Sequence, residues 1–158
     1  MHPITALLHT YDDALRLGRA LETLYPCDDI LVVDHGSRDA TVQIAREYGA
    51  RVVATKSTGQ NAEQLFKTAG WILCLDPRES LTEGLAASLF EWKTEGIPQN
   101  ALAFSIFIRE ETADGWIENP SAQTRLVRAD WSGWNGRFPR NHPHAVALEG
   151  ELLRFALP

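Results

Sequence analysis

Residues 4–34 read ITALLHTYDDALRLGRALETLYPCDDILVVD, and this stretch decides the expected fold. It begins with an apolar run at 4–8, continues with leucines and alanines at helical spacing, and ends in a second apolar run at 30–33. Apolar residues at spacings of three and four are typical of an amphipathic helix, whereas short continuous apolar runs are typical of buried strands. The stretch therefore predicts a strand, a helix and a second strand.

The strand and helix unit repeats through the first hundred residues. Apolar runs at 51–54 and 71–75 predict two more strands, and helical spacing at 41–48, 62–69 and 81–92 predicts a helix after each later strand. Strands that are apolar on both faces are typical of a parallel sheet covered by helices on each side. We therefore expect an α/β fold of Rossmann-like type, with a mainly parallel sheet and helices on both faces.

The last third of the chain has a different character. Residues 102–108 predict one more apolar strand, while 124–128 and 146–155 predict short antiparallel or irregular additions. The polar stretches 112–121 and 130–144 are rich in Gly, Pro, Asn and Trp, and they predict loops. Because the chain has no internal repeat and no linker, we expect one domain with a short mixed C-terminal extension.

Composition argues against several classes of protein. The chain has 158 residues, of which 44% are hydrophobic, enough for one buried core. Fifteen Lys and Arg against 21 Asp and Glu give a net charge of −6, whereas nucleic-acid binding needs a clustered basic surface. No apolar run approaches the ~20 residues of a membrane span, and the start lacks a secretory signal pattern, so we expect a cytoplasmic protein. Cys27 and Cys74 lack the spacing of a zinc site, and we expect both to be reduced.

Polar residues directly follow the predicted strands. Thr10, Tyr11 and Asp12 follow the first strand, Asp34 follows the second, and Asp76 follows the fourth. Ligands of open parallel sheets bind beyond the carboxyl ends of the strands. We therefore expect Asp34 and Asp76 to face one cleft.

A structural interpretation competes with this one for several of the polar residues. Ser, Thr and Asp are common helix caps, so Ser37, Asp39 and Thr82 are interpreted as caps. Capping explains Asp34 and Asp76 less well, because each of them directly ends an apolar strand. The sequence has no G-x-G-x-x-G after the first strand and no P-loop motif, which argues against dinucleotide oxidoreductases and P-loop NTPases.

Three blocks of the sequence carry a resemblance to a known family. ITALLHTYDDALRLGRALETL, DILVVDHGSRDATVQIAREYGARVV and WILCLDPRESLTEGL resemble, in order, spacing and content, the nucleotide-binding half of the family 2 glycosyltransferases of GT-A fold. The closest likeness is to bacterial sugar transferases of the lipopolysaccharide-core type. The resemblance implies a single GT-A-like domain over 1–158, with a nucleotide-binding half at 3–95 and a short acceptor-side part at 100–158.

The resemblance also implies a set of nucleotide-binding positions. The segment after the first strand, together with Asp34, matches positions that contact the base and ribose, and Asp76 matches the first Asp of the family's D-x-D. Asn61 matches a position in an Asn-containing helix that follows a Gly-rich loop. The expected nucleotide-binding residues are Thr10, Tyr11, Asp12, Asp34, Asn61, Asp76 and Arg78.

The D-x-D motif departs from the pattern of the family. It reads Asp76-Pro77-Arg78 here, and Glu79 follows it. A guanidinium replaces the carboxylate that would coordinate a cation, so Mg²⁺ or Mn²⁺ is disfavoured, with Asp76 and Glu79 as the remaining candidate metal ligands. Arg78 can instead donate two hydrogen bonds to a diphosphate.

The catalytic base of the family is also missing at its expected place, where residues 139–141 read Pro-Arg-Asn. Sugar transfer with inversion needs a carboxylate that takes the proton of the acceptor hydroxyl. The candidate bases elsewhere in the chain are Glu110, Glu111, Asp114 and Glu149. Trp131 and Trp134 are candidates for stacking on a sugar, although loop tryptophans also serve as packing anchors.

The expected function is that of a family 2 glycosyltransferase with weakened catalysis. The resemblance implies transfer of a hexosyl group with inversion from a UDP- or GDP-linked sugar to a saccharide or lipid-linked acceptor, in polysaccharide biosynthesis. It places the protein in the cytoplasm, with peripheral attachment to the inner membrane face as a variant. One alternative is a nucleotide-sugar-binding pseudoenzyme or regulatory module without transfer activity. Another is a Rossmann-like domain whose likeness is only architectural, since fold does not fix function.

Overall fold

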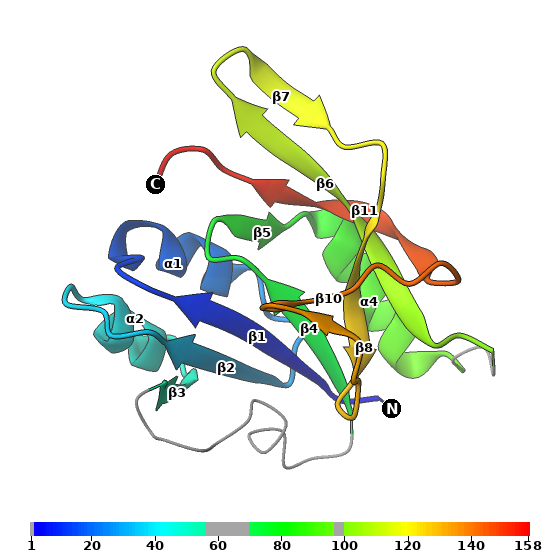
Figure 1. The fold of residues 1–158 in the computed structure, drawn as a ribbon, viewed down its shortest axis with the longest axis horizontal. Coiled ribbons are helices and arrows are strands. Elements are labelled where there is room, and N and C mark those ends of the chain that lie inside the picture. The colour runs from blue at the N-terminus through cyan, green and yellow to red at the C-terminus, as the bar shows by residue number, and fades with distance from the viewer. Residues whose placement is uncertain (1, 56–69, 97–99) are drawn as a thin grey trace.

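The computed structural model describes residues 2–55, 70–96 and 100–158, which form one large mixed sheet with helices (Figure 1). The order of the sheet is β3-β2-β1-β4-β8-β6-β11-β5, and β7 pairs with β6. The strands are β1 (Ile4–Thr10), β2 (Asp29–Asp34), β3 (Arg51–Ala54), β4 (Trp71–Leu75), β5 (Glu79–Leu81), β6 (Ala103–Thr112), β7 (Gly115–Glu118), β8 (Gln123–Arg128) and β11 (Val146–Arg154). A small separate hairpin consists of β9 (Trp134–Asn135) and β10 (Phe138–Pro139).

The first four strands are parallel, and their order reverses at β1. β1 pairs with β2 on one side, where Thr10 lies opposite Asp34, and with β4 on the other side, where Leu8 lies opposite Leu75. The chain therefore runs from β1 outward to β2 and β3 and then returns past β1 to β4. The carboxyl ends of β1, β2 and β4 consequently meet at one edge of the sheet.

The second half of the sheet is mixed. β8 pairs antiparallel with both β4 and β6, and β11 pairs parallel with β6 and antiparallel with β5. The β6–β7 hairpin projects from the body of the sheet, and β11 runs beside β6 toward the C-terminus (Figure 1). Strands from before and after residue 100 therefore form one continuous sheet.

The three described helices, α1 (Ala14–Glu22), α2 (Thr41–Glu47) and α4 (Glu83–Thr94), pack on the same face of the sheet. Side chains alternate along a strand, so Ala6 and Leu8 of β1 enter the core cluster under these helices, whereas Leu7 enters a second cluster on the opposite face. Trp131, Trp134 and Phe138 pack against that second cluster. The helix expected at 62–69 lies outside the described residues, so the expectation of helices on both faces stays a prediction.

The predicted strands at 51–54 and 71–75 are confirmed with the same bounds, as β3 and β4. Several other expectations are wrong. Residues 146–155, expected to be antiparallel or irregular, form β11, which pairs parallel with β6, and the expected loop 130–144 contains the β9–β10 hairpin. β5 was not predicted, because it is only three residues long and forms through pairing with β11, far away in the sequence. The stretch 112–121, expected to be a loop, contains β7, because its exposed residues pair with the extended end of β6.

A bulge in β11 docks on the start of α4. The register between β11 and β6 shifts between Ala147 and Glu151, and Gly150 has a φ of +92°. A Cβ at Gly150 would lie 2.3 Å from the backbone nitrogen of Leu85, so only glycine fits this close approach. Thr82 caps α4 by accepting from Leu85, as predicted, and its hydroxyl also donates to the carbonyl of Glu151 at 2.8 Å.

In the described parts of the chain, no helix is both long enough and apolar enough to cross a bilayer. Cys27 and Cys74 are free thiols, and burial raises the pKa of each to about 12.

Candidate functional site

The candidate site lies at the carboxyl ends of β1, β2 and β4. Thr10 and Asp34 lie side by side at the ends of β1 and β2, and Asp76 directly follows β4 on the other side of β1. Asp34 and Asp76 thus follow parallel strands at one edge, but the expectation that both face one cleft is not met, because Asp34 is buried. Ligands of open α/β sheets bind where the strand order reverses, which in this sheet is the position between β1 and β4.

Asp34 is buried, and protein donors use its acceptor capacity. Oδ1 accepts from the hydroxyls of Thr10 at 2.8 Å and Ser37 at 2.5 Å, and Oδ2 accepts from the backbone nitrogens of Gly36 and Ser37 at 3.2 and 2.9 Å. Burial alone would raise the pKa of Asp34, but these hydrogen bonds outweigh it and lower the pKa. A carboxylate has about four acceptor positions, and here they order the loop after β2. The carboxylate of Asp34 therefore orders this loop and does not face an open cleft.

The loops after β1 and β2 are joined by reciprocal hydrogen bonds. The backbone nitrogen of Asp12 donates to the Ser37 hydroxyl at 2.9 Å, and the carboxylate of Asp12 accepts from the nitrogen of Arg38 at 2.7 Å. Asp39 accepts from Ala14 at the start of α1. The interpretation of Ser37 as a cap is wrong, because its hydroxyl bonds to Asp12 and Asp34. Asp39 does act at a helix start as predicted, because its Oδ1 accepts from the backbone nitrogen of Thr41, the first residue of α2, at 3.0 Å. We refer to residues 10–14 and 34–41 as the paired loops.

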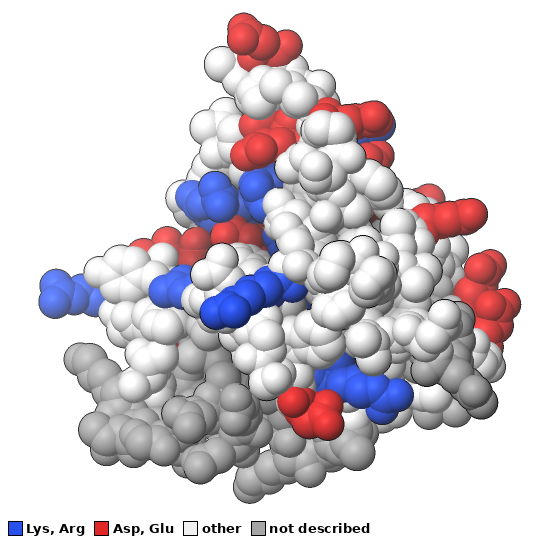
Figure 2. Space-filling view, turned by 45° about the vertical axis from the view of Figure 1, so that its right-hand side comes forward, with Lys and Arg blue, Asp and Glu red and all other residues white. Residues whose placement is uncertain are grey.

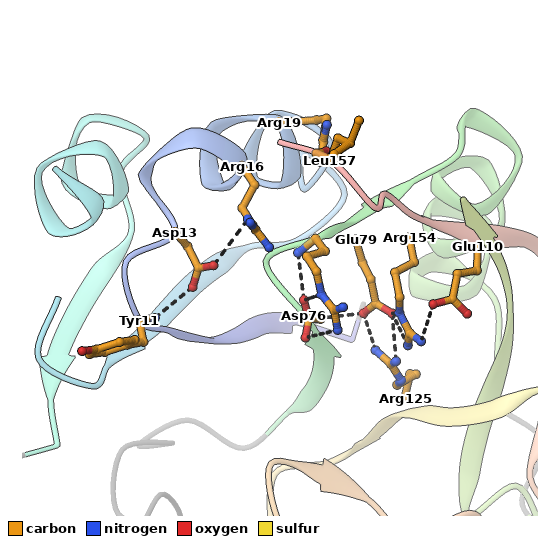
Figure 3. Close-up of polar contacts among 11 residues, drawn as sticks. Tyr11, Asp13, Arg16, Arg19, Asp76, Glu79, Glu110, Arg125, Arg154 and Leu157 are labelled. Atoms are coloured by element: carbon orange, nitrogen blue, oxygen red, sulfur yellow. Dashed lines mark hydrogen bonds and ion pairs between the residues drawn. The ribbon is translucent and has the colours of Figure 1, made fainter. Parts of the chain in front are cut away.

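Tyr11 is the exposed member of the paired loops. Its side chain is 58% exposed, while its backbone nitrogen donates to Asp13 at 2.9 Å (Figure 3). Asp12 adopts a φ of +50°, the left-handed region, which Asp tolerates better than most residues. Arg16 lies one turn into α1, with its guanidinium 3.6 Å from the carboxylate of Asp13. The ring of Tyr11 is therefore available for contact with a ligand at this edge.

Asp76 and Arg78 form an ion pair within the altered D-x-D motif. Oδ1 of Asp76 accepts from the backbone nitrogen and Nε of Arg78 at 2.9 Å each, and Oδ2 accepts from Nη2 at 3.3 Å. The Asp76 side chain is 24% exposed and that of Arg78 is 43% exposed. Burial raises the pKa of Asp76, but the bonds from Arg78 outweigh it, so the pKa is lowered. Asp76 lies between Asp13 and Glu79 in Figure 3.

Glu79 is a fully buried ion-pair centre and not a metal ligand. Arg125 donates to both of its oxygens at 2.7 and 3.0 Å, and Arg154 donates twice to Oε2 at 3.1 and 2.9 Å. Oε1 also accepts from the backbone nitrogen of Asp76 at 2.8 Å. Five donors occupy this carboxylate (Figure 3), so the assignment of Glu79 as a candidate metal ligand is wrong.

The donor set at this edge does not fit a bound divalent cation. Glu79 has no free oxygen, and Asp76 is held by the guanidinium of Arg78, whose charge would repel a metal ion. Across residues 2–55, 70–96 and 100–158, no three His, Cys, Asp or Glu side chains come together in a way that could hold a metal. The charge of a diphosphate at this edge would have to be balanced by arginines.

The four candidate bases lie in different places. Glu110, at the end of β6, is half-exposed, with Oε1 3.9 Å from Nη1 of Arg154, and it therefore lies beside the candidate site. Glu111 accepts from the backbone nitrogen of Ala156 at 3.1 Å, and Asp114 lies in the turn between β6 and β7. Glu149 lies in the β11 bulge, where its carbonyl accepts from Ser88 of α4. Of the four, Glu110 is the one that the fold connects to Glu79 through a shared arginine.

Trp131 and Trp134 act as packing anchors in the fold. The indole nitrogen of Trp131 donates to the carbonyl of Gly133 at 3.1 Å, and that of Trp134 donates to the carbonyl of Trp131 at 2.6 Å. Both rings are partly buried against the second core cluster. Their stacking on a sugar stays a prediction, and Asn61, another predicted site residue, lies outside the described residues.

A histidine pair joins β1 to the loop after β2. Nδ1 of His9 and Nε2 of His35 are 2.9 Å apart, so one ring donates to the other. Burial, the neighbouring His35 and Arg137 lower the pKa of His9 to about 4. Burial also lowers the pKa of His35, with Arg137 as the next cause. The folded protein therefore holds this pair neutral at pH 7.

Sequence reasoning missed Arg125 and Arg154. Arg125 is 1% exposed and lies in the buried stretch 124–127 of β8, where its guanidinium also stacks on Phe138 at 4.2 Å. An arginine next to the apolar pair Leu126 and Val127 in a predicted strand indicates a buried partner if it faces the core, because buried arginines are almost always paired. Arg125 within residues 123–128 could have been recognised in this way, but the sequence did not show that its partner is Glu79.

Charged side chains on the surface are mixed rather than segregated. On the face in Figure 2, basic side chains lie in several small groups, most of them next to acidic ones. A continuous basic surface of the kind that binds a nucleic-acid backbone is not seen on this face.

Comparison with known proteins gives relatives but no matching family model. A TPR repeat-containing protein of Synechococcus elongatus is 32% identical over 159 residues, covering 97% of this chain and 37% of that protein. An uncharacterized glycosyltransferase of Rickettsia felis is 33% identical over 90 residues, covering 54% of this chain and 32% of that protein. The chain thus spans about a third of the length of these relatives. A resemblance to glycosyltransferases is confirmed, while the family 2 and lipopolysaccharide-core assignments stay predictions.

Solved structures with a similar shape are more distant. Glucosyl-3-phosphoglycerate synthase of Mycobacterium tuberculosis matches with a TM-score of 0.44 and 17% identity, over 69% of this chain and 43% of that one. TarS residues 1–349 of S. aureus match with a TM-score of 0.48 and 16% identity, over 80% of this chain and 47% of that one. We draw no functional conclusion from these two matches.

Replacing Glu79 with Gln should strongly destabilise the fold. Glu79→Gln leaves the buried guanidinium of Arg125 without its counter-charge, and breaking a buried ion pair typically costs about 3–5 kcal/mol. The free energy of unfolding from urea denaturation measures the loss. Asp29→Asn is the matched control, because its pair with Arg51 is exposed and should contribute less than about 1 kcal/mol. Equal losses in the two variants would contradict the central role of Glu79.

The histidine pair should make stability depend on pH between about 4 and 6.5. An unfolded histidine has a pKa of about 6.5, so in this window the unfolded chain binds a proton that folded His9 excludes. Stability is therefore full above pH 6.5 and is lost as the pH falls, by about 1–2 kcal/mol between pH 7 and pH 5. Urea denaturation at pH 7, 6 and 5 should show a weaker dependence in His9→Gln. The exposed control His144→Gln should keep the wild-type slope, and a slope unchanged in His9→Gln would refute the assignment.

Proposed function

We propose that this chain is the donor-binding part of a nucleotide-sugar-dependent glycosyltransferase, of the inverting family 2 type. The observation that carries the proposal is the reversal of strand order at β1, which brings the paired loops and the Asp76–Arg78 pair to one edge. Relatives named as glycosyltransferases match 87 to 90 residues of the chain, in support of the same class. The donor would carry UDP or GDP.

The paired loops are suited to hold the nucleoside. Ser37 and Asp39 accept from the backbone of residues 10–14, and Asp34 binds the Thr10 hydroxyl, so the conformation of this segment is fixed before a ligand arrives. The exposed ring of Tyr11 offers an aromatic face to the base. In this proposal Thr10 and Asp34 position the loop, and Tyr11 and Asp12 contact the nucleoside.

Arg78 is suited to hold the diphosphate in place of a cation. Its bonds to Asp76 use Nε and Nη2, and a guanidinium has five N–H donors in all. The side chain is 43% exposed, so it can reach a ligand without breaking a buried contact. Arginine binds phosphate in a planar, bidentate way and stays charged at every physiological pH.

Glu110 is the proposed catalytic base. In the transfer step its carboxylate takes the proton of the acceptor hydroxyl while the acceptor oxygen forms a bond to the anomeric carbon. The bond between that carbon and the diphosphate oxygen breaks, and its electron pair stays on the diphosphate, where Arg78 stabilises the charge. Arg154 positions Glu110 through the contact at 3.9 Å.

The acceptor is proposed to be a saccharide or a lipid-linked saccharide, as in polysaccharide biosynthesis on the cytoplasmic side of a membrane. The alternative is a binding module that retains the nucleotide pocket and lacks transfer. The exposed carboxylate of Glu110 beside the edge favours the enzyme. The two functions differ in one measurable respect, which is release of nucleoside diphosphate in the presence of an acceptor.

Binding of the nucleotide should not need a divalent cation. We expect calorimetric titration with UDP, GDP and their sugar conjugates to give the same affinity in EDTA and in Mg²⁺. Arg78→Ala should weaken binding at least fivefold, because it removes charge-assisted bonds to the diphosphate, each contributing about 1.5–3 kcal/mol. Arg78→Asp should instead create a site that binds only with Mn²⁺ or Mg²⁺.

The matched control for these arginine variants is Arg128→Ala. Arg128 lies opposite Trp71 at the amino end of β4, the far end of the strand from Asp76, so its loss should leave nucleotide affinity unchanged. Loss of wild-type binding in EDTA, or full binding by Arg78→Ala, would show that arginine does not replace the cation.

Replacing Glu110 with Gln should abolish transfer and spare donor binding. Because a positioned base contributes about 10²–10⁴-fold in rate, Glu110→Gln should reduce release of nucleoside diphosphate at least 100-fold. Donor affinity should stay within twofold of wild type. Asp114→Asn, in the turn of the same hairpin, is the control and should keep the wild-type rate. A wild-type protein that binds donors but transfers to no acceptor would favour the binding module, and loss of transfer in Glu149→Gln alone would place the base elsewhere.

A further inference from the structure

A cleft lies away from the candidate site at the carboxyl ends of β1, β2 and β4. It has a volume of about 610 Å³ and lies between the start of α4, the middle of β6, the end of β7 and the β11 bulge. Its lining includes Thr82, Phe107, Glu118, Asn119, Pro120 and Glu151. Ligand pockets typically have volumes of about 300–1,000 Å³, so this cleft is of the size that holds a small organic ligand.

The cleft offers an aromatic ring beside a carboxylate. Phe107 is 38% exposed although it lies in the middle of a sheet, and Glu151 lies directly opposite it in the register of β6 and β11. Gly150 and Gly84 let the bulge lie against α4, and neither glycine carries a side chain that would fill the cleft. The backbone nitrogen of Asn119 donates to the carbonyl of Ile108 at 3.0 Å, which holds the residue at the rim of the cleft.

Arg109 organises the two carboxylates of the cleft. Its Nη2 lies 2.8 Å from Glu118 and 3.2 Å from Glu151. Two carboxylates with one guanidinium leave a net charge of −1, which disfavours phosphate, carboxylate and other anions. Oxygen atoms of both carboxylates remain able to accept hydrogen bonds from neutral donors, because each carboxylate has about four acceptor positions.

These groups match the chemistry of a neutral sugar. A saccharide has hydroxyl donors around its rim, which suit carboxylate and amide acceptors, and apolar C–H faces, which suit the negative face of a phenyl ring. We propose that this cleft binds a neutral saccharide, with Phe107 as the stacking platform and Glu118, Asn119 and Glu151 as hydrogen-bond partners of the hydroxyls. Its role as the place that holds the acceptor chain rests on the proposed function, whereas the binding itself does not.

The cleft is separate from the transfer site. Side chains alternate along a strand, so Phe107 and Arg109 lie on the opposite face of β6 from Glu110. Glu110 and Arg154 are neighbours in the register of β6 and β11, and they lie toward Glu79. Saccharide binding in the cleft should therefore be independent of nucleotide binding at the edge.

The test is ligand-observed NMR and calorimetry with neutral di- and trisaccharides of glucose, galactose, mannose and N-acetylglucosamine. At least one should bind, and Phe107→Ala should weaken it at least tenfold and Glu151→Gln at least threefold. Ile117→Ala is the matched control, because Ile117 is an exposed apolar residue of β7 that alternates to the other face from Glu118. It should change saccharide affinity by less than twofold, and thermal unfolding should show that all three variants are folded.

Titration with UDP distinguishes the proposed saccharide cleft from the proposed nucleotide site. Saturating UDP should leave saccharide affinity within twofold, and Phe107→Ala should leave UDP affinity unchanged. Saccharide binding through Phe107 without any nucleotide binding would overturn the proposed function and support the cleft. The cleft proposal is overturned if no saccharide of the panel binds, if UDP displaces the sugar, or if only a polyamine such as spermidine binds.

Discussion

The buried carboxylate of Glu79 is the interaction on which the rest of the site depends. Arg125 of β8 and Arg154 of β11 both donate to it, so one charge connects the start of β5 to two strands of the second half of the chain. A buried guanidinium without a partner is costly, so the paired state resists any rearrangement of these strands. Because Oε1 of Glu79 also accepts from the nitrogen of Asp76, the same centre fixes the place of the altered D-x-D motif.

The paired loops concern a different requirement at the same edge, which is the order of residues 10–14 before a ligand binds. A loop that binds a nucleotide must be ordered, and ordering about five residues on binding would cost free energy that subtracts from affinity. Here Ser37 and Asp39 accept from backbone nitrogens of the loop after β1, and Asp34 holds Ser37 in place, through hydrogen bonds that exist without a ligand. In the proposed function, the polar residues after β2 therefore contribute to nucleotide binding indirectly, through the shape of the loop that carries Tyr11.

The sequence showed the local features of this protein and few of its distant pairings. Strands β3 and β4 and the cap at Thr82 follow from residues that are neighbours in the chain, and each was predictable from spacing and residue type. β5 and the Glu79 pairs were not, because the partners of Glu79 are 46 and 75 residues away. The placement of Asp34 at the edge was predictable from strand polarity, but its burial was not, because it depends on donors from two loops at once.

The pairing of Asp76 with Arg78 follows from the charge balance at the edge. Glu79 is already balanced by two arginines, so Asp76 is the carboxylate of the motif that still needs a positive partner. A divalent cation would satisfy it and would add a net positive charge toward a phosphate, but the described residues bring no three His, Cys, Asp or Glu side chains together to hold one. A guanidinium two residues away satisfies the carboxylate without other ligands and keeps N–H donors for an anion. Because Arg78 is part of the chain, its positive charge is present in every folded molecule and does not vary with the concentration of a metal ion.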